Sequence, residues 1–146
     1  MDASDRKAWE KAQRKKRLID IAETVFFRMG FDGATMPMIA DAAGYNKRTI
    51  YLYFKNKDDI IVQIFTYKTT QLFERFREEV DQADSAIGKL RNLVRRHLEE
   101  FQKNRSMAVL YQSETHQNSR LVETQIKAMS KMYVDIISEI VEIGRA

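Results

Sequence analysis

Glycine and proline are scarce in this chain, with five glycines and one proline among 146 residues. Both residue types interrupt helices, so their positions divide the chain into helical segments. Between the breaks, apolar residues recur at spacings of three and four, the periodicity of one helix face. No segment alternates between apolar and polar residues as a half-buried strand does. The sequence therefore predicts an all-α fold.

The breaks also predict where the helices lie. A first helix is expected from near Trp9 to Gly30, where glycine suits a C-terminal stop. Two short helices follow, one capped by Thr35 and ended by Gly44, the other capped by Asn46.

Roughly four more helices are expected, over about residues 57–81, 85–103, 107–115 and from 120 onward. We expect two domains, residues 1–56 and residues 57–146.

Positive charge is concentrated near the N-terminus. Residues 1–57 contain twelve Lys and Arg against seven Asp and Glu, whereas residues 58–146 contain thirteen against fourteen. A basic N-terminal part suits a polyanion such as nucleic acid. A lysine-rich segment that only keeps the chain in solution explains the charge equally well. The basic run at residues 14–17 is most simply a solvated helix start, and a contact with DNA phosphates or the minor groove is the alternative.

Composition argues against several function classes. The chain has no cysteine, and its only histidines are His97 and His116, so no metal site and no cofactor is expected. No apolar stretch approaches the roughly 20 residues of a membrane span, and no apolar secretory signal is present, which predicts a cytoplasmic protein without a membrane partner. We find no convergent acid, base and nucleophile, so an enzyme is not expected.

The most informative spacing is Ala40-x3-Gly44-x5-Ile50. Two helices that cross closely need a small side chain such as Ala40 at the contact. A tight turn between them needs a residue that tolerates positive φ, such as Gly44. Ile50 then packs the second helix against the first. This arrangement is typical of a helix-turn-helix, whose second helix enters the major groove of DNA.

The flanks strengthen this interpretation. Residues 30–35 read Gly-Phe-Asp-Gly-Ala-Thr, residues 39–44 read Ile-Ala-Asp-Ala-Ala-Gly, and residues 51–57 read Tyr-Leu-Tyr-Phe-Lys-Asn-Lys. In order and spacing they resemble the N-terminal DNA-binding domain of the TetR family of bacterial transcriptional regulators, over about residues 17–65. The resemblance implies a three-helix head with a helix-turn-helix, and a helical ligand-sensing body after it.

Several side chains around the second short helix suit contact with DNA. Arg48 suits the edge of a guanine, Lys47 a guanine or a phosphate, and Thr49 a thymine methyl or a phosphate oxygen. Tyrosine hydroxyls and lysines nearby suit the phosphate backbone. The candidate DNA-binding residues are Thr35, Lys47, Arg48, Thr49, Tyr51, Tyr53, Lys55 and Lys57. Among them, the resemblance places Thr35, Thr49, Tyr53 and Lys57 on the family's usual phosphate contacts.

The resemblance also implies a function and partners. Members of the family are repressors that bind a palindromic double-stranded operator as homodimers and are released by a small effector in the body. Relative to the family, this chain stops before the last two helices of the dimerising bundle, so we expect a shortened body.

Apolar residues in the second half are candidates for an effector site, although an ordinary core is the default interpretation of each. They are Phe65, Leu72, Phe76, Val94, Leu98, Phe101, Leu110, Tyr111, Met129 and Tyr133. Residues 50–60 and 110–114 resemble the branch of the family that controls fatty-acid degradation, which implies a long-chain acyl-CoA as the effector. Arg95, Arg96 and Arg120 would then be candidates for the CoA phosphates. A different class stays open: a helical protein-interaction module with a basic head and no sequence-specific role on DNA.

Overall fold

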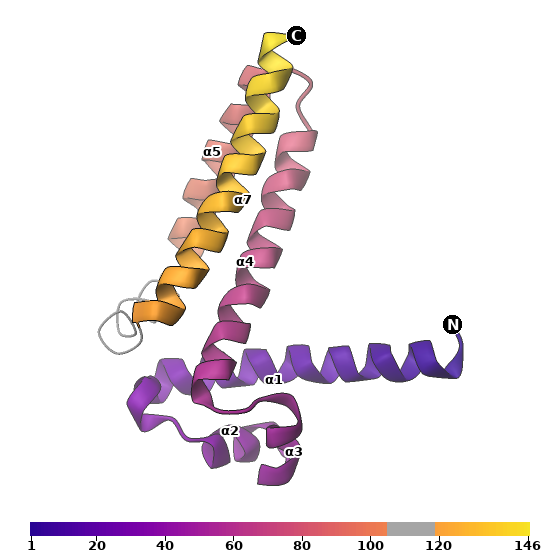
Figure 1. The fold of residues 1–146 in the computed structure, drawn as a ribbon, viewed down its shortest axis with the longest axis vertical. Coiled ribbons are helices and arrows are strands. Elements are labelled where there is room, and N and C mark those ends of the chain that lie inside the picture. The colour runs from indigo at the N-terminus through magenta and orange to yellow at the C-terminus, as the bar shows by residue number, and fades with distance from the viewer. Residues whose placement is uncertain (105–118) are drawn as a thin grey trace. The chain divides into compact units, whose positions relative to one another are not determined.

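The structure, a computed structural model, describes residues 1–104 and 119–146. Every regular element in these residues is an α-helix, so the all-α prediction is confirmed (Figure 1). The helices are α1 (Ala3–Gly33), α2 (Met36–Ala43), α3 (Lys47–Tyr53), α4 (Lys57–Asp81), α5 (Ala86–Lys103) and α7 (Ser119–Arg145). The helix expected at 107–115, with the candidate effector residues Leu110 and Tyr111, lies outside the described residues.

The chain divides into two compact units, Met1–Ile64 and Phe65–Ala146, which we call the head and the body. The head contains α1, α2, α3 and the first two turns of α4. The body contains the rest of α4 with α5 and α7. Over residues 1–104 and 119–146, none of the helices has an apolar stretch long enough to cross a bilayer.

The first helix starts six residues earlier than the sequence predicted, at Ala3 instead of near Trp9. The Asp2 carboxylate accepts a hydrogen bond from the Asp5 backbone N–H at 2.8 Å, and the Asp5 carboxylate accepts one from the backbone N–H of Asp2 at 3.4 Å. This reciprocal cap fixes the helix start. The prediction was wrong because it followed apolar periodicity, which the polar first turns lack. At the other end Gly30 leaves the helical region, with φ of 72°, as predicted.

The core of the head forms between α1 and the two short helices. One face of α1 is buried, and α2 contacts both α1 and α3. Ala40 is 1% exposed, which fits the small side chain expected at a close helix crossing. Ile50 and Phe54 are buried as well, and they hold α3 and the residue that follows it against the head.

The core of the body joins three helices that lie side by side in Figure 1. The apolar side chains that α4, α5 and α7 bury together form one cluster. Its members are Phe73, Phe76, Val80, Leu93, Ile136 and Ile140.

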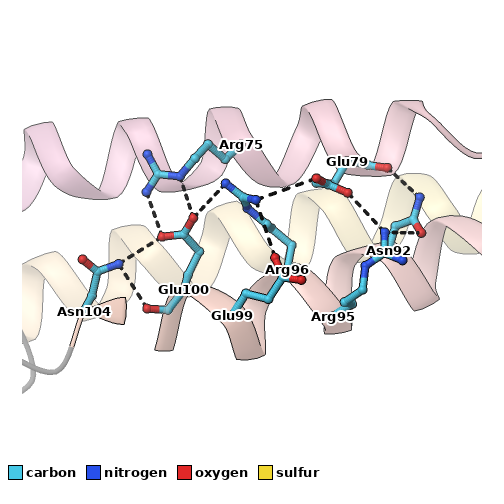
Figure 2. Close-up of polar contacts among 8 residues, drawn as sticks. All are labelled: Arg75, Glu79, Asn92, Arg95, Arg96, Glu99, Glu100 and Asn104. Carbon is cyan, nitrogen blue, oxygen red and sulfur yellow. Dashed lines mark hydrogen bonds and ion pairs between the residues drawn. The ribbon is translucent and has the colours of Figure 1, made fainter. Parts of the chain in front are cut away.

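Ionic contacts add to the packing of α4 against α5 (Figure 2). Among the described residues, Glu100 on α5 is the one buried charged side chain. Arg75 on α4 donates to both of its carboxylate oxygens, from Nε at 2.8 Å and from Nη2 at 3.0 Å. Arg96 Nη2 lies 3.1 Å from Glu100 Oε1, and Asn104 Nδ2 donates to Oε2 at 3.0 Å. The buried carboxylate therefore has partners on both oxygens, which is the condition for placing a charge inside a protein.

The pKa of Glu100 reflects a competition between burial and these partners. Burial acts to raise the pKa of the carboxyl. The hydrogen bonds and positive charge of Arg75, the charge of Arg96 and the Asn104 amide act against burial and hold the pKa below its ordinary value of 4.5. The charged form of Glu100 is therefore favoured by folding.

Replacing Glu100 by alanine should lower the free energy of unfolding by about 3 kcal/mol, because Arg75 and Arg96 would be left without their shared anion. We expect the lower end of the range for buried pairs, since the Arg75 side chain is still 35% exposed. The matched control is Glu99→Ala, which removes a weaker 3.6 Å contact to Arg96 from a 45% exposed side chain and should cost less than about 1 kcal/mol. Urea unfolding at pH 7 measures both, and equal losses would contradict the role given to Glu100.

The same network predicts a pH dependence. Because the pKa of Glu100 is lower in the folded chain than in the unfolded one, its stabilisation is present above pH 4.5 and is lost as the pH falls through the folded pKa. The stability gap between the wild type and Glu100→Ala should therefore narrow below pH 4.5. A gap that stays constant down to pH 3 would show that the charge of Glu100 is not what stabilises the body.

Candidate nucleic-acid interface

Local cap chemistry sets the ends of the two short helices of the head. The Thr35 hydroxyl oxygen accepts a hydrogen bond from the Met38 N–H at 3.2 Å at the start of α2, as the sequence predicted. Gly44 ends α2 in the left-handed region, with φ of 72° and ψ of 25°. Asn46 then caps α3, with its Oδ1 accepting from the Thr49 N–H at 2.8 Å. The turn between α2 and α3 is thus closed on both sides by side-chain or backbone hydrogen bonds.

Helix α3 has one buried face and one open face. Ile50 is fully buried. Lys47 and Arg48 in the first turn are exposed, as are Tyr51 and Leu52 one turn later. Positions i, i+1, i+4 and i+5 of a helix form one continuous surface, so these four side chains share the outer face. α3 therefore presents two cations, a phenol and a leucine away from the core.

The cations on this face differ in how far the protein engages them. Lys47 Nζ lies 5.9 Å from the centre of the Tyr51 ring, a loose cation–π distance. Arg48 is exposed, and within the described residues it makes no ion pair. Lys55 is exposed just beyond α3, where its backbone N–H donates to Asp59 Oδ2 at 2.9 Å. The side chains of Arg48 and Lys55 are thus accessible to a ligand.

Lys57 is held by the head itself. Its ammonium donates to the Phe31 carbonyl oxygen at 2.7 Å and lies 4.6 Å from the centre of the Phe31 ring. The side chain therefore ties the first turn of α4 to the segment after Gly30. An ammonium has three N–H donors, so a contact with an outside anion is compatible with this bond.

The remaining candidates are the two threonines and Tyr53. Thr35 is exposed at the start of α2, and Tyr53 is half-buried, with its ring centre 6.5 Å from that of Phe54. The Thr49 hydroxyl donates to Asn46 Oδ1 at 2.8 Å, so its hydrogen is used inside the cap while its oxygen remains an acceptor.

Leu52 was not among the residues predicted to contact DNA. It is 75% exposed, four residues after Arg48 and on the face of α3 opposite Ile50. The spacing from Ile50 was the available signal, because a residue two positions from a buried one on a helix points away from the core. An exposed leucine beside Arg48 suits an apolar part of a base edge, such as a thymine methyl.

The candidate effector residues that the structure describes differ in their burial. Phe65 and Phe76 are fully buried, and Leu72, Met129 and Tyr133 are partly buried against the core cluster. Val94, Leu98 and Phe101 on α5 are 52%, 58% and 69% exposed.

Two of the exposed candidates, Val94 and Leu98, line an open and mainly apolar groove of about 630 Å³ along α5. Of the three arginines, Arg96 is engaged by Glu100 and Arg95 by Glu79, at 3.1 and 3.3 Å, while Arg120 is exposed.

Tyr133 is the described candidate effector residue whose pKa is shifted from its ordinary value. Its hydroxyl shares a hydrogen bond with His97 Nδ1, and its ring packs edge-on against Phe73. Burial raises the pKa of Tyr133 to about 12, so the phenol stays protonated at neutral pH. No cluster of His, Asp and Glu suited to a metal ion occurs in the part of the chain that the structure describes.

Known proteins match both units. Residues 18–64 match the family described as bacterial regulatory proteins, tetR family, and residues 65–146 match the YsiA-like protein, C-terminal region. The fatty acid metabolism regulator protein of Bacillus subtilis is 30% identical over 135 residues, which are 92% of this chain and 70% of that protein. The transcriptional repressor KstR2 of Mycolicibacterium smegmatis is 33% identical over 138 residues, 91% of this chain and 67% of the repressor.

A solved structure is similar over the same span. It is that of the transcriptional regulator FadR from Bacillus subtilis in complex with stearoyl-CoA, with a TM-score of 0.73 and 31% identity. The match covers 88% of this chain and 69% of that one. The resemblance found in the sequence of the head thus extends through the body.

Replacing Gly44 by valine should destabilise the head by about 2 kcal/mol or more, because a β-branched residue is strained at a φ of 72°. Apart from Gly44 and the backbone next to it, no atom of the described residues lies within 4 Å of the Cβ position, so the penalty comes from the backbone conformation and not from a clash. Gly44→Asn is the matched control and should retain most of the stability, since asparagine tolerates this conformation. Thermal unfolding measures both variants. If valine and asparagine were equally tolerated, the turn would not depend on a left-handed residue.

Proposed function

Because this chain belongs to the TetR family of bacterial regulatory proteins, we propose that it represses transcription by binding a DNA operator and releases it on binding a small apolar effector. Both relatives described above are named as regulators, and one of them as a repressor. The proposal places the protein in the cytoplasm, where bacterial DNA is found.

The observation that carries the DNA-binding part of the proposal is the outer face of α3. Arg48 and Lys47 are exposed in its first turn while Ile50 fixes the helix from behind. A recognition helix meets base edges with its N-terminal residues, so two cations are available where they would be needed. The guanidinium of Arg48 can donate two parallel hydrogen bonds to guanine O6 and N7.

The surrounding candidates fit contacts with the phosphate backbone, which position a protein on DNA without reading its sequence. Thr35 is exposed at the start of α2, Tyr53 is half-buried at the end of α3, and Lys55 is exposed just after α3. For Lys57 we propose two functions, a structural bond to Phe31 and a phosphate contact through a remaining N–H. Thr49 and Tyr51 complete the proposed contact set.

Homodimers are typical of the family, and two heads in a dimer bind half-sites about one helical turn apart, roughly 34 Å. We therefore propose that the operator is palindromic. A helical interaction module with a basic head, the alternative left by the sequence, would bind an acidic protein and show no preference among DNA sequences. Selection of bound sites from random DNA separates the two, because only the regulator should enrich a palindrome.

Arg48→Ala should weaken binding to the selected operator by about 1–3 kcal/mol and relax the preference at one base position. Lys55→Ala, a change of the same charge just outside α3, should weaken all sequences alike and lower the salt slope of log K by about one. Binding of a panel of single-base operator variants at several salt concentrations measures both effects. Unchanged base preference in Arg48→Ala would rule out base reading by this residue.

For the effector we propose a long-chain acyl-CoA. The B. subtilis regulator FadR, 31% identical, was solved with stearoyl-CoA. In this chain Leu72, Met129 and Tyr133 border the body core, and methionine adapts to irregular apolar ligands. The exposed apolar side chains of Val94 and Leu98 form a second surface, against which an acyl chain would be shielded from water.

A hundredfold excess of palmitoyl-CoA over its Kd should stabilise the protein by about 2.7 kcal/mol, which a thermal melt detects as a higher Tm. Free CoA is the matched control and should give little shift, because most of the binding energy would come from the acyl chain. The ligand is kept below its micelle concentration. No shift with palmitoyl-CoA would remove this effector class while leaving the DNA-binding proposal intact.

A further inference from the structure

The N-terminal half of α1 is a helical arm that packs against nothing in the described head. We define the arm as residues 3–17. All of its side chains are exposed except Glu10, which is partly exposed, and burial on α1 begins at Leu18. In Figure 1 the arm continues α1 past α2 and α3. The side chains of the arm therefore make no contribution to the core of the head.

The arm carries a stripe of four cations along one side. Its members recur at positions i, i+4, i+7 and i+8, which fall on one face of a helix. The stripe consists of Lys7, Lys11, Arg14 and Lys15. Four cations on one face of a helix can contact several neighbouring phosphates of a DNA strand.

The same face continues into the buried face of α1. Further along the helix, positions i+11, i+15, i+18 and i+19 counted from Lys7 are apolar and buried. They are Leu18, Ala22, Val25 and Phe26. This buried face is the one that α1 offers to the core shared with α2. The cationic stripe therefore points to the side of α1 on which the helix-turn-helix lies.

This direction brings the stripe toward DNA if α3 occupies the major groove, so the inference rests on the proposed function. The major groove is about 8.5 Å deep, so the phosphates at its edges rise well above the bases that α3 would touch. An arm of 15 residues is about 22 Å long, which equals about six base-pair steps. Lysine and arginine side chains on such an arm can reach phosphates next to the operator half-site.

We propose that the arm binds the phosphate backbone of the DNA that flanks the bases read by α3. The arm supplies affinity and no sequence preference, since its contacts are to phosphates. Each phosphate it neutralises releases counterions, so the arm should add to the salt dependence of binding.

The test compares two double variants of the full chain that remove equal charge. Lys11→Gln/Lys15→Gln empties the middle of the stripe, and Lys16→Gln/Arg17→Gln removes two cations from the other side of the same helix. Glutamine is close to lysine and arginine in helix propensity, and circular dichroism checks that the arm stays helical. Each protein is titrated with the selected operator, as a short duplex that ends at the site and as a duplex with about ten more base pairs on each side.

The wild type should bind the long duplex about tenfold more tightly than the short one, and Lys11→Gln/Lys15→Gln should lose most of that gain. The salt slope on the long duplex should fall by about two in this variant and by much less in the control. The base preference should be unchanged in both. Equal behaviour of the two double variants, or no gain from flanking DNA, would overturn the proposal.

Two further outcomes separate the arm from the proposed function. If the wild type preferred no DNA sequence, the proposed function would fail and the arm proposal with it. If it preferred the operator but the stripe variant matched the wild type on both duplexes, only the arm proposal would fail. Trp9 is 56% exposed on the arm, so vesicles with 30% anionic lipid are titrated too, and stripe-dependent binding to them without an effect of flanking DNA would overturn the assignment to DNA.

Discussion

The candidate interface depends on the burial of Ile50 and Phe54. Helix α3 has seven residues, and isolated helices shorter than about 12 residues are marginal in water. Its helical state is therefore maintained by packing against the rest of the head. The same contacts fix which side of α3 faces outward, so the exposure of Arg48 follows from apolar packing on the opposite side of the helix. The side chains proposed to contact DNA and the side chain that packs in the core thus lie on opposite faces of the same short helix.

Charge is used differently in the two units. In the described body, Glu100 is paired with Arg75 and Arg96, and its bond to Arg75 joins α5 to α4. In the head, Lys57 is tied to the Phe31 carbonyl, whereas Arg48 is left open to solvent. A buried ion must be paired to be tolerated, but an ion that serves an outside ligand must stay accessible. Exposure and pairing thus separate structural charges from those available to a polyanion.

The helix ends were predictable wherever a local signal existed. Thr35, Gly44 and Asn46 act within three or four residues of themselves, so their effect can be inferred from sequence alone. The start of α1 was not found, because the Asp2 cap begins a polar stretch without apolar periodicity. Leu52 was missed for a different reason: its spacing from Ile50 indicated the outer face of α3, but a leucine carries no charge or hydrogen-bonding group that predicts contact with DNA.

The sequence by itself determined the fold class, the helix-turn-helix spacing and which charged and polar side chains α3 carries, since these rest on residue identity, periodicity and local hydrogen bonding. Only the tertiary structure decided which of those side chains are engaged by the protein. It bonded Lys57 to the Phe31 carbonyl, paired Glu100 on α5 with Arg75 on α4 and buried Phe76 in the body core. The physical reason is that burial and pairing arise from contacts between residues distant in the chain, and no local pattern specifies those partners.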